Sequence, residues 1–299
     1  MPLSTRMRII AAKAETNAGE PVAINNADTL FYGYDGGIVN NVAFNAMGAA
    51  GTLSLRPAQP GEESGQHTFT TEFMLDAPWS TILMPSLGWT NTGSAWSPTD
   101  NTALWSWLTS GQNEAGRLKK ISGAMSSAVI TLPAGGIPTV AWTLMGRYEA
   151  EANATQWTPA FTVASQHAGL RLGSSVTTLA NTAISIATAT LSIKNEVSLV
   201  MDTNASGGIA YAWIGSRAIE LVIDPLEELA RGDDAAQRAK TIQAFSMAWG
   251  SMSVSVPYAQ IQPIAPGDRN GLSARSLTMI ATTNGTAGDE CVINFNTVA

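Results

Sequence analysis

Residues 132–149 read LPAGGIPTVAWTLMGRYE, and this stretch decides how the rest of the chain is interpreted. Its central run, 139–145, carries no charged residue and is rich in β-branched and aromatic side chains, which favours a strand. An exposed apolar strand with free backbone groups on its edge invites pairing with other chains. The run is therefore expected to be a core strand or a strand whose edge a neighbouring subunit completes.

The segments on either side of this run extend it into a hairpin. Residues 117–125 and 128–132 read as strands, and the loop 133–138 contains two prolines and two glycines, a turn signal. After Arg147 the sequence becomes small and polar (AEANATQWTP), which indicates a domain boundary near residue 150. The predicted domains are 1–150 and 151–299.

Each half is expected to contain strands, one helix, more strands and a terminal hairpin. In the first half, 67–75 alternates like a half-buried strand and 78–87 reads as a short helix ending at Gly88. In the second half, the strongest helix signal covers 233–249, with an apolar stripe that would pack on a sheet. The stripe includes Ile242, Phe245 and Trp249.

The remaining segments of the second half read as strands. Asn284-Gly285 is a strong hairpin turn signal, and it predicts that 274–282 pairs with 290–295. The similar element order of the two halves suggests a tandem repeat, although their residue identity is weak. The other predicted strands are 185–199, 210–214, 217–223, 251–256 and 258–264.

The charge content limits the classes of partner. Only 13% of the 299 residues are charged and the net charge is −7, so the surface is expected to be largely neutral or partly covered by neighbours. An acidic chain does not bind nucleic acid through its bulk charge, because phosphate neutralisation needs clustered Lys and Arg. A negative wall would instead repel DNA.

Catalytic and metal-binding signatures are missing from the sequence. His67 and His167 are the only histidines, so a multi-histidine metal site is excluded, and no nucleotide-binding loop or nucleophile elbow is present. The single cysteine, Cys291, fits folding in a reducing cytoplasm, and no apolar run approaches a membrane span. We expect a protein that is not an enzyme, has no cofactor and has no membrane partner.

The nine tryptophans leave a second interpretation open. Aromatic platforms stack on sugar rings, so a carbohydrate-binding or adhesin-like β-sandwich is an alternative. More often such residues anchor cores and interfaces.

The order of several motifs resembles the major tail tube proteins of long, flexible-tailed bacteriophages. Three stretches of the first half carry this resemblance, and each is similar to a family element. The matching residues are Glu15, Thr16, Gly19, Ala27, Asp28 and Leu30 in the opening segment; Phe69, Glu72, Trp79, Leu83, Gly88 and Trp89 in a strand and short helix; and Gly136, Ile137, Pro138, Trp142, Leu144, Gly146 and Tyr148 in the hairpin. In the second half the segments 188–199 (TATLSIKNEVSL) and 210–228 (AYAWIGSRAIELVIDPLEE) are also similar to the family, so that the resemblance extends over most of residues 8–296.

The resemblance implies a fold and a function. Such proteins form a β-sandwich with a flanking helix, and their inner sheets join across subunits into a β-barrel around a channel. Stacked rings then build the tail tube through which the tape-measure protein and DNA pass, with tail terminator and tip proteins at its ends. The implied location is the virion tail, after synthesis in the bacterial host cytoplasm. A tube protein of a related contractile or secretion system is a further alternative.

The ring has two expected stoichiometries. If each half of the chain is one tube-type sandwich, three chains give a ring with pseudo-sixfold symmetry; a single sandwich would need six chains. The element order favours the trimer. The residues expected at the intersubunit strand or hairpin are Thr139, Ala141, Trp142, Leu144, Arg147 and Tyr148, and the acidic residues expected to face the lumen are Glu151, Glu196 and Glu220.

Overall fold

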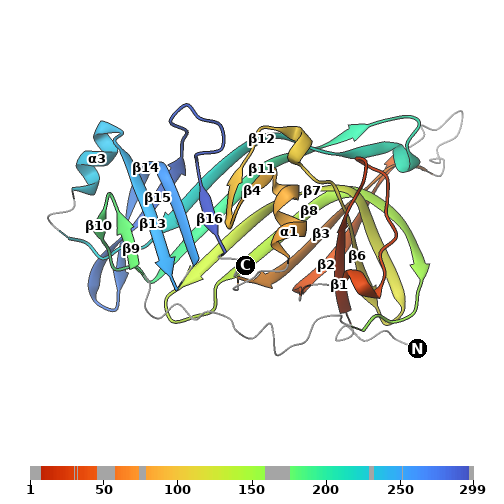
Figure 1. Cartoon of the computed structure of the whole chain (residues 1–299), viewed down its shortest axis with the longest axis horizontal. Helices are drawn as coiled ribbons and strands as arrows, with labels where there is room; N and C mark the ends of the chain where they lie inside the picture. The colour runs from red at the N-terminus through yellow and green to blue at the C-terminus, as the bar shows by residue number, and fades with distance from the viewer. Residues whose placement is uncertain are drawn as a thin grey trace, which may run out of the picture.

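The computed structural model describes residues 8–29, 31, 33–45, 58–73, 79–158, 176–228, 232–250 and 252–295. The chain is mainly β, and its strands belong to one large antiparallel sheet that does not close on itself. Helical segments are short, and Figure 1 shows α1 and α3 as separate elements, with α3 at one end of the molecule.

The bounds of the elements are as follows. The strands are β1 (Arg8–Ala14), β2 (Tyr34–Asn45), β3 (Gln59–Glu72), β4 (Trp89–Thr92), β5 (Ala95–Pro98), β6 (Leu108–Glu114), β7 (Arg117–Pro133), β8 (Thr139–Asn153), β9 (Val176–Leu179), β10 (Thr182–Ala183), β11 (Thr188–Met201), β12 (Ile209–Ile223), β13 (Ile242–Trp249), β14 (Met252–Arg269), β15 (Leu272–Ala281) and β16 (Val292–Asn294). The helices are α1 (Ser80–Leu83) and α3 (Asp233–Ala239), and the 3-10 turns are η2 (Asn26–Asp28), η3 (Met84–Leu87), η4 (Thr102–Leu104) and η5 (Ser206–Gly208).

The main path of the sheet runs in the order β10-β9-β13-β14-β15-β12-β11-β7-β8-β3-β2. β6 pairs with the first part of β7 and carries β1 on its other edge, while β16 links β14 to β5. Within this path the order β2-β3-β8-β7 in the first half matches β11-β12-β15-β14 in the second. In the first group the hairpin β2–β3 lies beside the hairpin β7–β8, and in the second the hairpin β11–β12 lies beside the hairpin β14–β15, with the four strands in the same spatial order.

One face of the sheet is covered and the other is open. On β8, Trp142 and Leu144 are buried, while Ala141 is exposed and Thr143 is partly exposed. The stretch that opened the sequence analysis is therefore apolar on its covered face and lined by small residues on its open face. Neighbouring strands continue this open face with Thr68, Thr70, Ser127, Val129, Thr131 and Thr190.

Aromatic side chains fill the core between the sheet and α1. The ring of Trp79 lies edge-on to Trp142, with centroids 5.3 Å apart, and Phe73 contacts Phe295 at 4.7 Å. Gly88, with φ of 73°, ends the turn η3 in the left-handed conformation that glycine adopts without strain. The short helix expected over 78–87 is confirmed as α1 followed by η3.

The hairpin at the centre of the sequence is also confirmed. β7 and β8 pair from Thr131 with Thr139 to Arg117 with Asn153, and the two strands expected over 117–125 and 128–132 form one continuous strand. The register shifts between Ser122 and Met125, which lets β7 bend and serve different neighbours at its two ends.

The predicted helix over 233–249 is wrong beyond residue 239. Lys240 adopts a left-handed conformation with φ of 52° and ends α3, and the following residues form β13. Phe245 and Trp249 are buried as expected, but from a strand whose alternate residues face the core; Ile242 is exposed. The four-residue spacing of Phe245 and Trp249 fits a helix and a strand alike, whereas Ile242 lies three residues before Phe245 and therefore falls on the other face of the strand.

The predicted hairpin between 274–282 and 290–295 is also wrong. β15 pairs with β12 and β14, whereas β16 pairs with β14 and β5. The alternate residues Cys291, Ile293 and Phe295 are all buried, so the core, rather than the turn at Gly285, determines where this strand lies.

The sheet continues without a break between the two halves of the sequence. β8 runs through position 150, and β11 pairs with β7 from Thr188 opposite Pro133 to Ile193 opposite Ala128. The division into domains 1–150 and 151–299 stays a prediction.

Candidate assembly surface

The expected intersubunit strand lies inside the sheet of one chain. β8 pairs with β3 over Thr139–Arg147 and with β7 over Thr139–Asn153, so both edges of the segment 139–147 are paired within the chain. Over that segment both strand partners come from the same chain, and the assignment of these residues to an intersubunit contact stays a prediction. Trp142, Leu144, Arg147 and Tyr148 are buried, whereas Thr139 and Ala141 lie on the open face.

Arg147 is buried in a polar network that joins three parts of the chain. Its guanidinium donates to Glu149 Oε1 at 3.0 Å, to the carbonyl of Ile209 at 3.2 Å and to the carbonyl of Gly19 at 3.2 Å. Glu149 also accepts a hydrogen bond from Ser122. The arginine thus ties β8 to the beginning of β12 and to the segment that follows β1.

Glu15 and Gly19, which match the opening motif of the resembled family, belong to the same network. The Glu15 carboxylate accepts hydrogen bonds from Thr109 Oγ1 at 2.7 Å and from the amides of Gly123 at 2.7 Å and Gly19 at 2.9 Å. A Cβ at Gly19 would lie 2.1 Å from the carbonyl oxygen of Ala210, so only glycine fits. Burial raises the pKa of Glu15, although these hydrogen bonds and Arg147 act against the rise.

The three glutamates expected to face a lumen all have partners within the chain. Glu151 pairs with Arg117 and accepts a hydrogen bond from the Tyr148 hydroxyl at 2.9 Å. Glu220 pairs with Lys194 at 2.9 Å, and Glu196 accepts a hydrogen bond from Ser216. The charges of Glu151 and Glu220 are therefore partly balanced by cations, whereas Glu196 is bonded to a neutral hydroxyl. The orientation of all three toward a channel stays a prediction.

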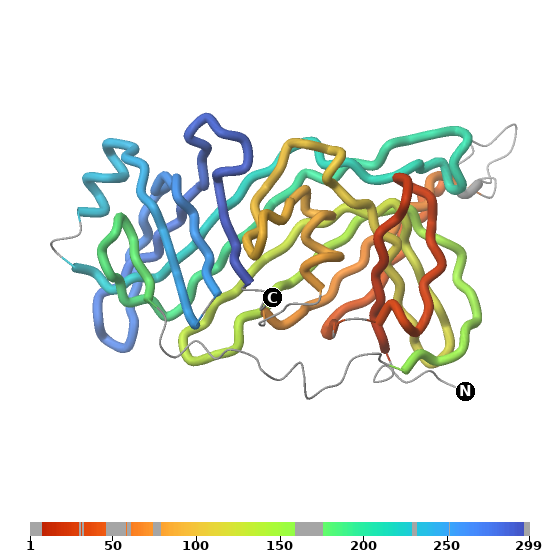
Figure 2. Tube along the Cα trace, viewed as in Figure 1, coloured from red at the N-terminus to blue at the C-terminus, as the bar shows by residue number. Residues whose placement is uncertain are grey.

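One half of the hairpin β11–β12 pairs with β7 within the sheet, and the other half lies over β7. The near half pairs with β7, but β6 occupies the same edge of β7 further along, so the far half must leave that edge. We call this far half, residues 195–214, the covered arm. Figure 2 shows the β11–β12 ribbon running along the upper side toward the end of the molecule that holds β1 and β2.

The covered arm is held by both polar and apolar contacts. Asn195 Nδ2 donates to the carbonyls of Leu87 at 3.0 Å and Ser126 at 2.8 Å. Ala212 and Ile214 form a small core with Met125 of β7, against which Val197 packs. The arm is therefore an integral part of the fold rather than a loose hairpin.

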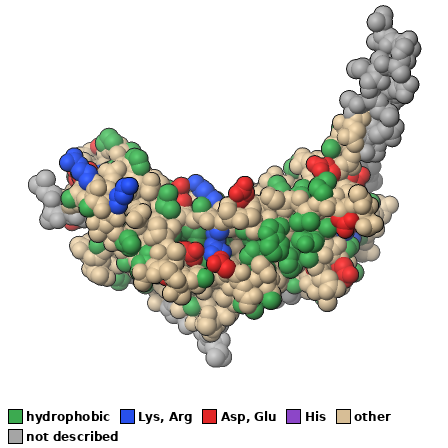
Figure 3. Space-filling view, turned by 90° about the horizontal axis from the view of Figure 1, so that it is seen from above, with side chains coloured by type: hydrophobic (Ala, Val, Ile, Leu, Met, Phe, Trp, Pro, Cys, Tyr) green, Lys and Arg blue, Asp and Glu red, His purple; other side chains and the backbone are tan. Residues whose placement is uncertain are grey.

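Three partly buried tryptophans cover one side of this small core. Trp213 lies 5.1 Å from Trp105 and 6.4 Å from Trp107, centroid to centroid, and the indole N–H of Trp107 donates to the carbonyl of Ala212 at 2.7 Å. Figure 3, which looks onto the side where β12 lies in Figure 1, shows one patch of hydrophobic side chains beside basic and acidic ones. Because these rings stack on one another, they favour packing over a flat sugar platform.

The hairpin β2–β3 is the counterpart at the open end of the sheet. β2 pairs with β3 only, so its other edge has no strand partner among the described residues. Two of its groups meet side chains instead: the amide of Ile38 donates to Gln112 Oε1 at 3.2 Å, and the carbonyl of Gly36 accepts from Arg8. We call residues 39–45 with 58–64 the free arm.

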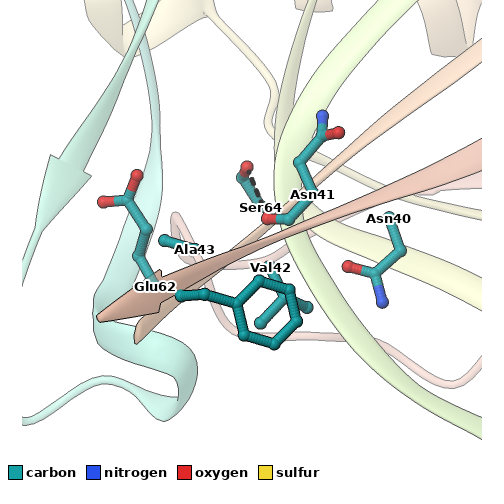
Figure 4. Close-up of a pocket in the computed structure, with 7 residues that line it drawn as sticks. Asn40, Asn41, Val42, Ala43, Glu62 and Ser64 are labelled. Atoms are coloured by element: carbon teal, nitrogen blue, oxygen red, sulfur yellow. Dashed lines mark hydrogen bonds between the residues drawn. The ribbon is translucent and has the colours of Figure 1, made fainter. Parts of the chain in front are cut away.

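The free arm displays apolar side chains to solvent. Val39 is 55% exposed and Phe44 is 75% exposed. Figure 4 shows a shallow hollow along this ribbon, lined by residues of β2 with Glu62 and Ser64 of β3, in which the Ser64 hydroxyl donates to the Asn41 carbonyl. An exposed aromatic residue at an unpaired strand is typical of a surface that awaits a partner.

A second open edge belongs to β14. β13 pairs with β14 as far as Gln260, and in the described part of the chain no strand pairs with that edge over residues 262–269. Pro263 and Pro266 lie in this segment, and prolines on an edge remove backbone donors. The helix α3 contacts the start of this open segment of β14, where Gln237 Nε2 donates to the Gln262 carbonyl at 3.1 Å.

The described residues contain no cluster of three or more His, Cys, Asp or Glu side chains that could hold a metal ion. Cys291 is a free, buried thiol whose pKa is raised by burial and by Glu290. No helix in the described segments is long and apolar enough to cross a membrane.

Sequence reasoning missed both open edges and the two arms. In the segment 36–45 (GGIVNNVAFN), Ile38, Val42 and Phe44 share one face, but Asn40 interrupts that face and apolar residues also lie on the other, so the period-two signal of a strand is weak. No signal in the sequence distinguishes the free arm from the covered arm, because the difference depends on which strands of the fold lie beside each arm.

The comparison with protein family models gave no match, and the comparison with curated proteins gave none either. The function of the chain is therefore argued from its geometry.

Proposed function

We propose that the chain is the structural subunit of a phage tail tube of the long, flexible type. It assembles as rings that stack into a tube, and the tube is the channel for the tape-measure protein and DNA. The observation that carries this proposal is the repeated four-stranded order, β2-β3-β8-β7 and β11-β12-β15-β14, within one sheet that is open at both ends.

The details of pairing support a tandem duplication behind this repeat. β6 and β7 form a hairpin with a register shift after the pair Ser110–Ile121, and β13 and β14 form one with a shift after the pair Phe245–Val256. β1 extends the first hairpin as β9 extends the second. A shared irregularity at the corresponding position favours a common origin over chance, because bulges are retained as functional features within families.

Head-to-tail joining follows from this arrangement. The repeated sheets of each chain begin with β2 at one end and finish with β14 at the other. The same contact between β2 and β14 can therefore recur from chain to chain until a ring closes. Three chains bring six similar four-stranded sheets, which favours the trimer with pseudo-sixfold symmetry over a hexamer. A closed sheet has no edges, so the unpaired strands would be satisfied by assembly.

The composition agrees with such a role. The open face is formed mainly by Thr, Ser, Ala and Val, and the chain carries a net charge of −7. A neutral to acidic wall lets DNA slide without binding, since binding depends on neutralising phosphates with clustered cations. Tail terminator and tip proteins would close the ends of the stack, and no cofactor is required.

Electron microscopy of the purified chain at several concentrations tests the proposal, together with mass photometry of the smallest species. Hollow rings or tubes and a three-chain mass are expected. A six-chain mass would overturn the trimer, and a monomer without rings at any concentration would favour a binding module instead. Tubes that form without a tape-measure partner in the genetic neighbourhood would favour a contractile or secretion system.

A further inference from the structure

We infer that the free arm of one copy lies on the β13–β14–β15 sheet of a second copy, with β2 pairing antiparallel to the open edge of β14. The inference rests on the proposed ring and goes further, because it assigns the strands, the register and the side chains of the junction. The occupant of both open edges is thus another copy of this chain.

The junction between the two halves of a single chain provides the template. β11 pairs antiparallel with the last residues of β7, from Ala128 to Pro133, and its far half then lies over β7 as the covered arm. β11 and β2 occupy the same place in the repeated strand order, and so do β7 and β14. The corresponding junction in a ring is therefore β2 of one copy against β14 of the next.

The vacant position matches the template in detail. β6 occupies the edge of β7 as far as Ala124 and leaves the later residues to β11. β13 occupies the edge of β14 as far as Gln260, and the described structure contains no strand on the rest of that edge. The open segment 262–269 is long enough for the six residue pairs that join β11 to β7.

The side chains that the free arm exposes correspond to side chains that are packed against the sheet in the covered arm. Pairing across the repeated sheets places Phe44 at the position of Val197, which packs against the small core formed by Met125 and Ala212. Phe44 is 75% exposed in a single copy. Contact with the second copy would remove part of this apolar surface from water, so we expect Phe44 to anchor the junction.

The register of the junction follows from two corresponding rows of residues. One row runs Val39, Gln66, Met145, Met125 across β2, β3, β8 and β7. The other runs Ser192, Glu220, Ile280, Gln260 across β11, β12, β15 and β14. Val39 therefore corresponds to Ser192, which lies opposite Val129, four residues after Met125.

Counting from Gln260 gives the partner of Val39. β14 has a register shift between Ile261 and Ile264 that adds one residue, so the fifth residue after Gln260, Ala265, takes the position of Val129. Ala265 is exposed, whereas Ile264 packs against the core, in agreement with this choice. Pro266 then faces Ile38, and its carbonyl would accept the Ile38 amide in place of Gln112 Oε1, the partner of that amide in a single copy. Pro266 has no amide hydrogen, so this junction has one backbone donor fewer than its template.

Disulfide cross-linking tests this register directly. The amide of Ile38 points away from β3, so Val39 occupies a non-hydrogen-bonded position on the open edge, where opposite Cβ atoms approach most closely. We expect an equimolar mixture of Val39→Cys and Ala265→Cys chains to form a covalent dimer on oxidation. Val39→Cys mixed with Ser276→Cys is the control, because Ser276 lies one strand further in, opposite Ala265. Rings that form without the 39–265 cross-link would overturn the junction but not the tube.

A substitution in the free arm gives an independent measurement. Phe44→Asp is expected to leave the monomer folded, by circular dichroism, and to abolish ring formation in mass photometry, whereas Phe44→Leu retains it. Leu104→Asp is the matched control, because Leu104 is also an exposed hydrophobic residue, at 47%, and lies outside both arms. Normal rings from Phe44→Asp would overturn the inference. If the unsubstituted chain forms no rings and the mixture of Val39→Cys and Ala265→Cys chains forms no cross-link, both the junction and the proposed function fail.

Discussion

Replacing Arg147 with methionine tests whether the buried network holds the covered arm on the sheet. Arg147 is 6% exposed and reaches Glu149, Ile209 and Gly19 through hydrogen bonds of 3.0–3.2 Å. Removing one partner of a buried ion pair costs about 3–5 kcal/mol, because the other charge is left uncompensated. The Glu149 side chain is 20% exposed, so water can solvate part of its charge, and we expect a loss near the lower limit, about 3 kcal/mol.

Urea denaturation followed by tryptophan fluorescence measures this loss, and hydrogen exchange locates it. Amides of the covered arm should exchange faster in Arg147→Met than in the parent chain, because the arm loses its contact at Ile209. Lys194→Met is the control: Lys194 pairs with Glu220 but its side chain is 56% exposed, so its loss should cost less than about 1 kcal/mol. If the two variants are destabilised equally, the buried network does not have the role described for it.

Three further predictions concern the interior of the fold. Burial, followed by the charge of Arg8, lowers the pKa of His67 to about 3, so the unfolded state takes up the proton first. His67 should therefore make stability fall between about pH 6.5 and pH 3, by up to about 1.4 kcal/mol per pH unit, and His67→Gln urea melts should lack this part of the fall, while the part due to carboxyl groups remains. Asn195→Ala removes two hydrogen bonds to buried carbonyls and should cost about 1–3 kcal/mol in the same melts, with faster exchange confined to the covered arm. Trp142→Phe leaves the Thr71 hydroxyl without its indole donor at 2.8 Å and should lower the free energy of unfolding by about 1–2 kcal/mol; an unchanged midpoint would contradict this.

The sequence predicted the parts of the fold that local pattern controls. The hairpin around residues 128–145 was recognisable because apolar runs flank a loop rich in proline and glycine, and Gly88 marked the end of the short helix. Both signals act over a few residues, and in these two segments the tertiary contacts agree with them.

The errors arose where a local signal competed with the core. Residues 242–249 place apolar side chains at spacings that suit a helix or a strand, and the place beside β14 decided in favour of a strand. The turn at Asn284-Gly285 suggested a hairpin, but Phe295 packs against Phe73 far away in the sequence and draws β16 to β14 and β5. Tertiary packing outweighed turn propensity in that region.

The candidate assembly surface was the least predictable feature. Its definition depends on which strand edges remain unpaired, and that is known only when every other strand has been placed. The sequence pointed to β8, whose run 139–145 carries no charge, yet both edges of that run are paired within one chain. The unpaired edges belong to β2 and β14, where polar residues, prolines and the exposed Phe44 carry weaker signals.

The prolines of β14 also have a consequence for symmetry. Two β14 edges brought together by a twofold axis would each face segments in which Pro263 and Pro266 lack an amide hydrogen, so both sides would lose donors at once. A β2 edge contains no proline and does not share this deficit. A contact between two β14 edges would therefore form fewer backbone hydrogen bonds than a contact between β14 and β2. This difference disfavours twofold pairs and favours growth in one direction, as in a polymer with distinct head and tail groups.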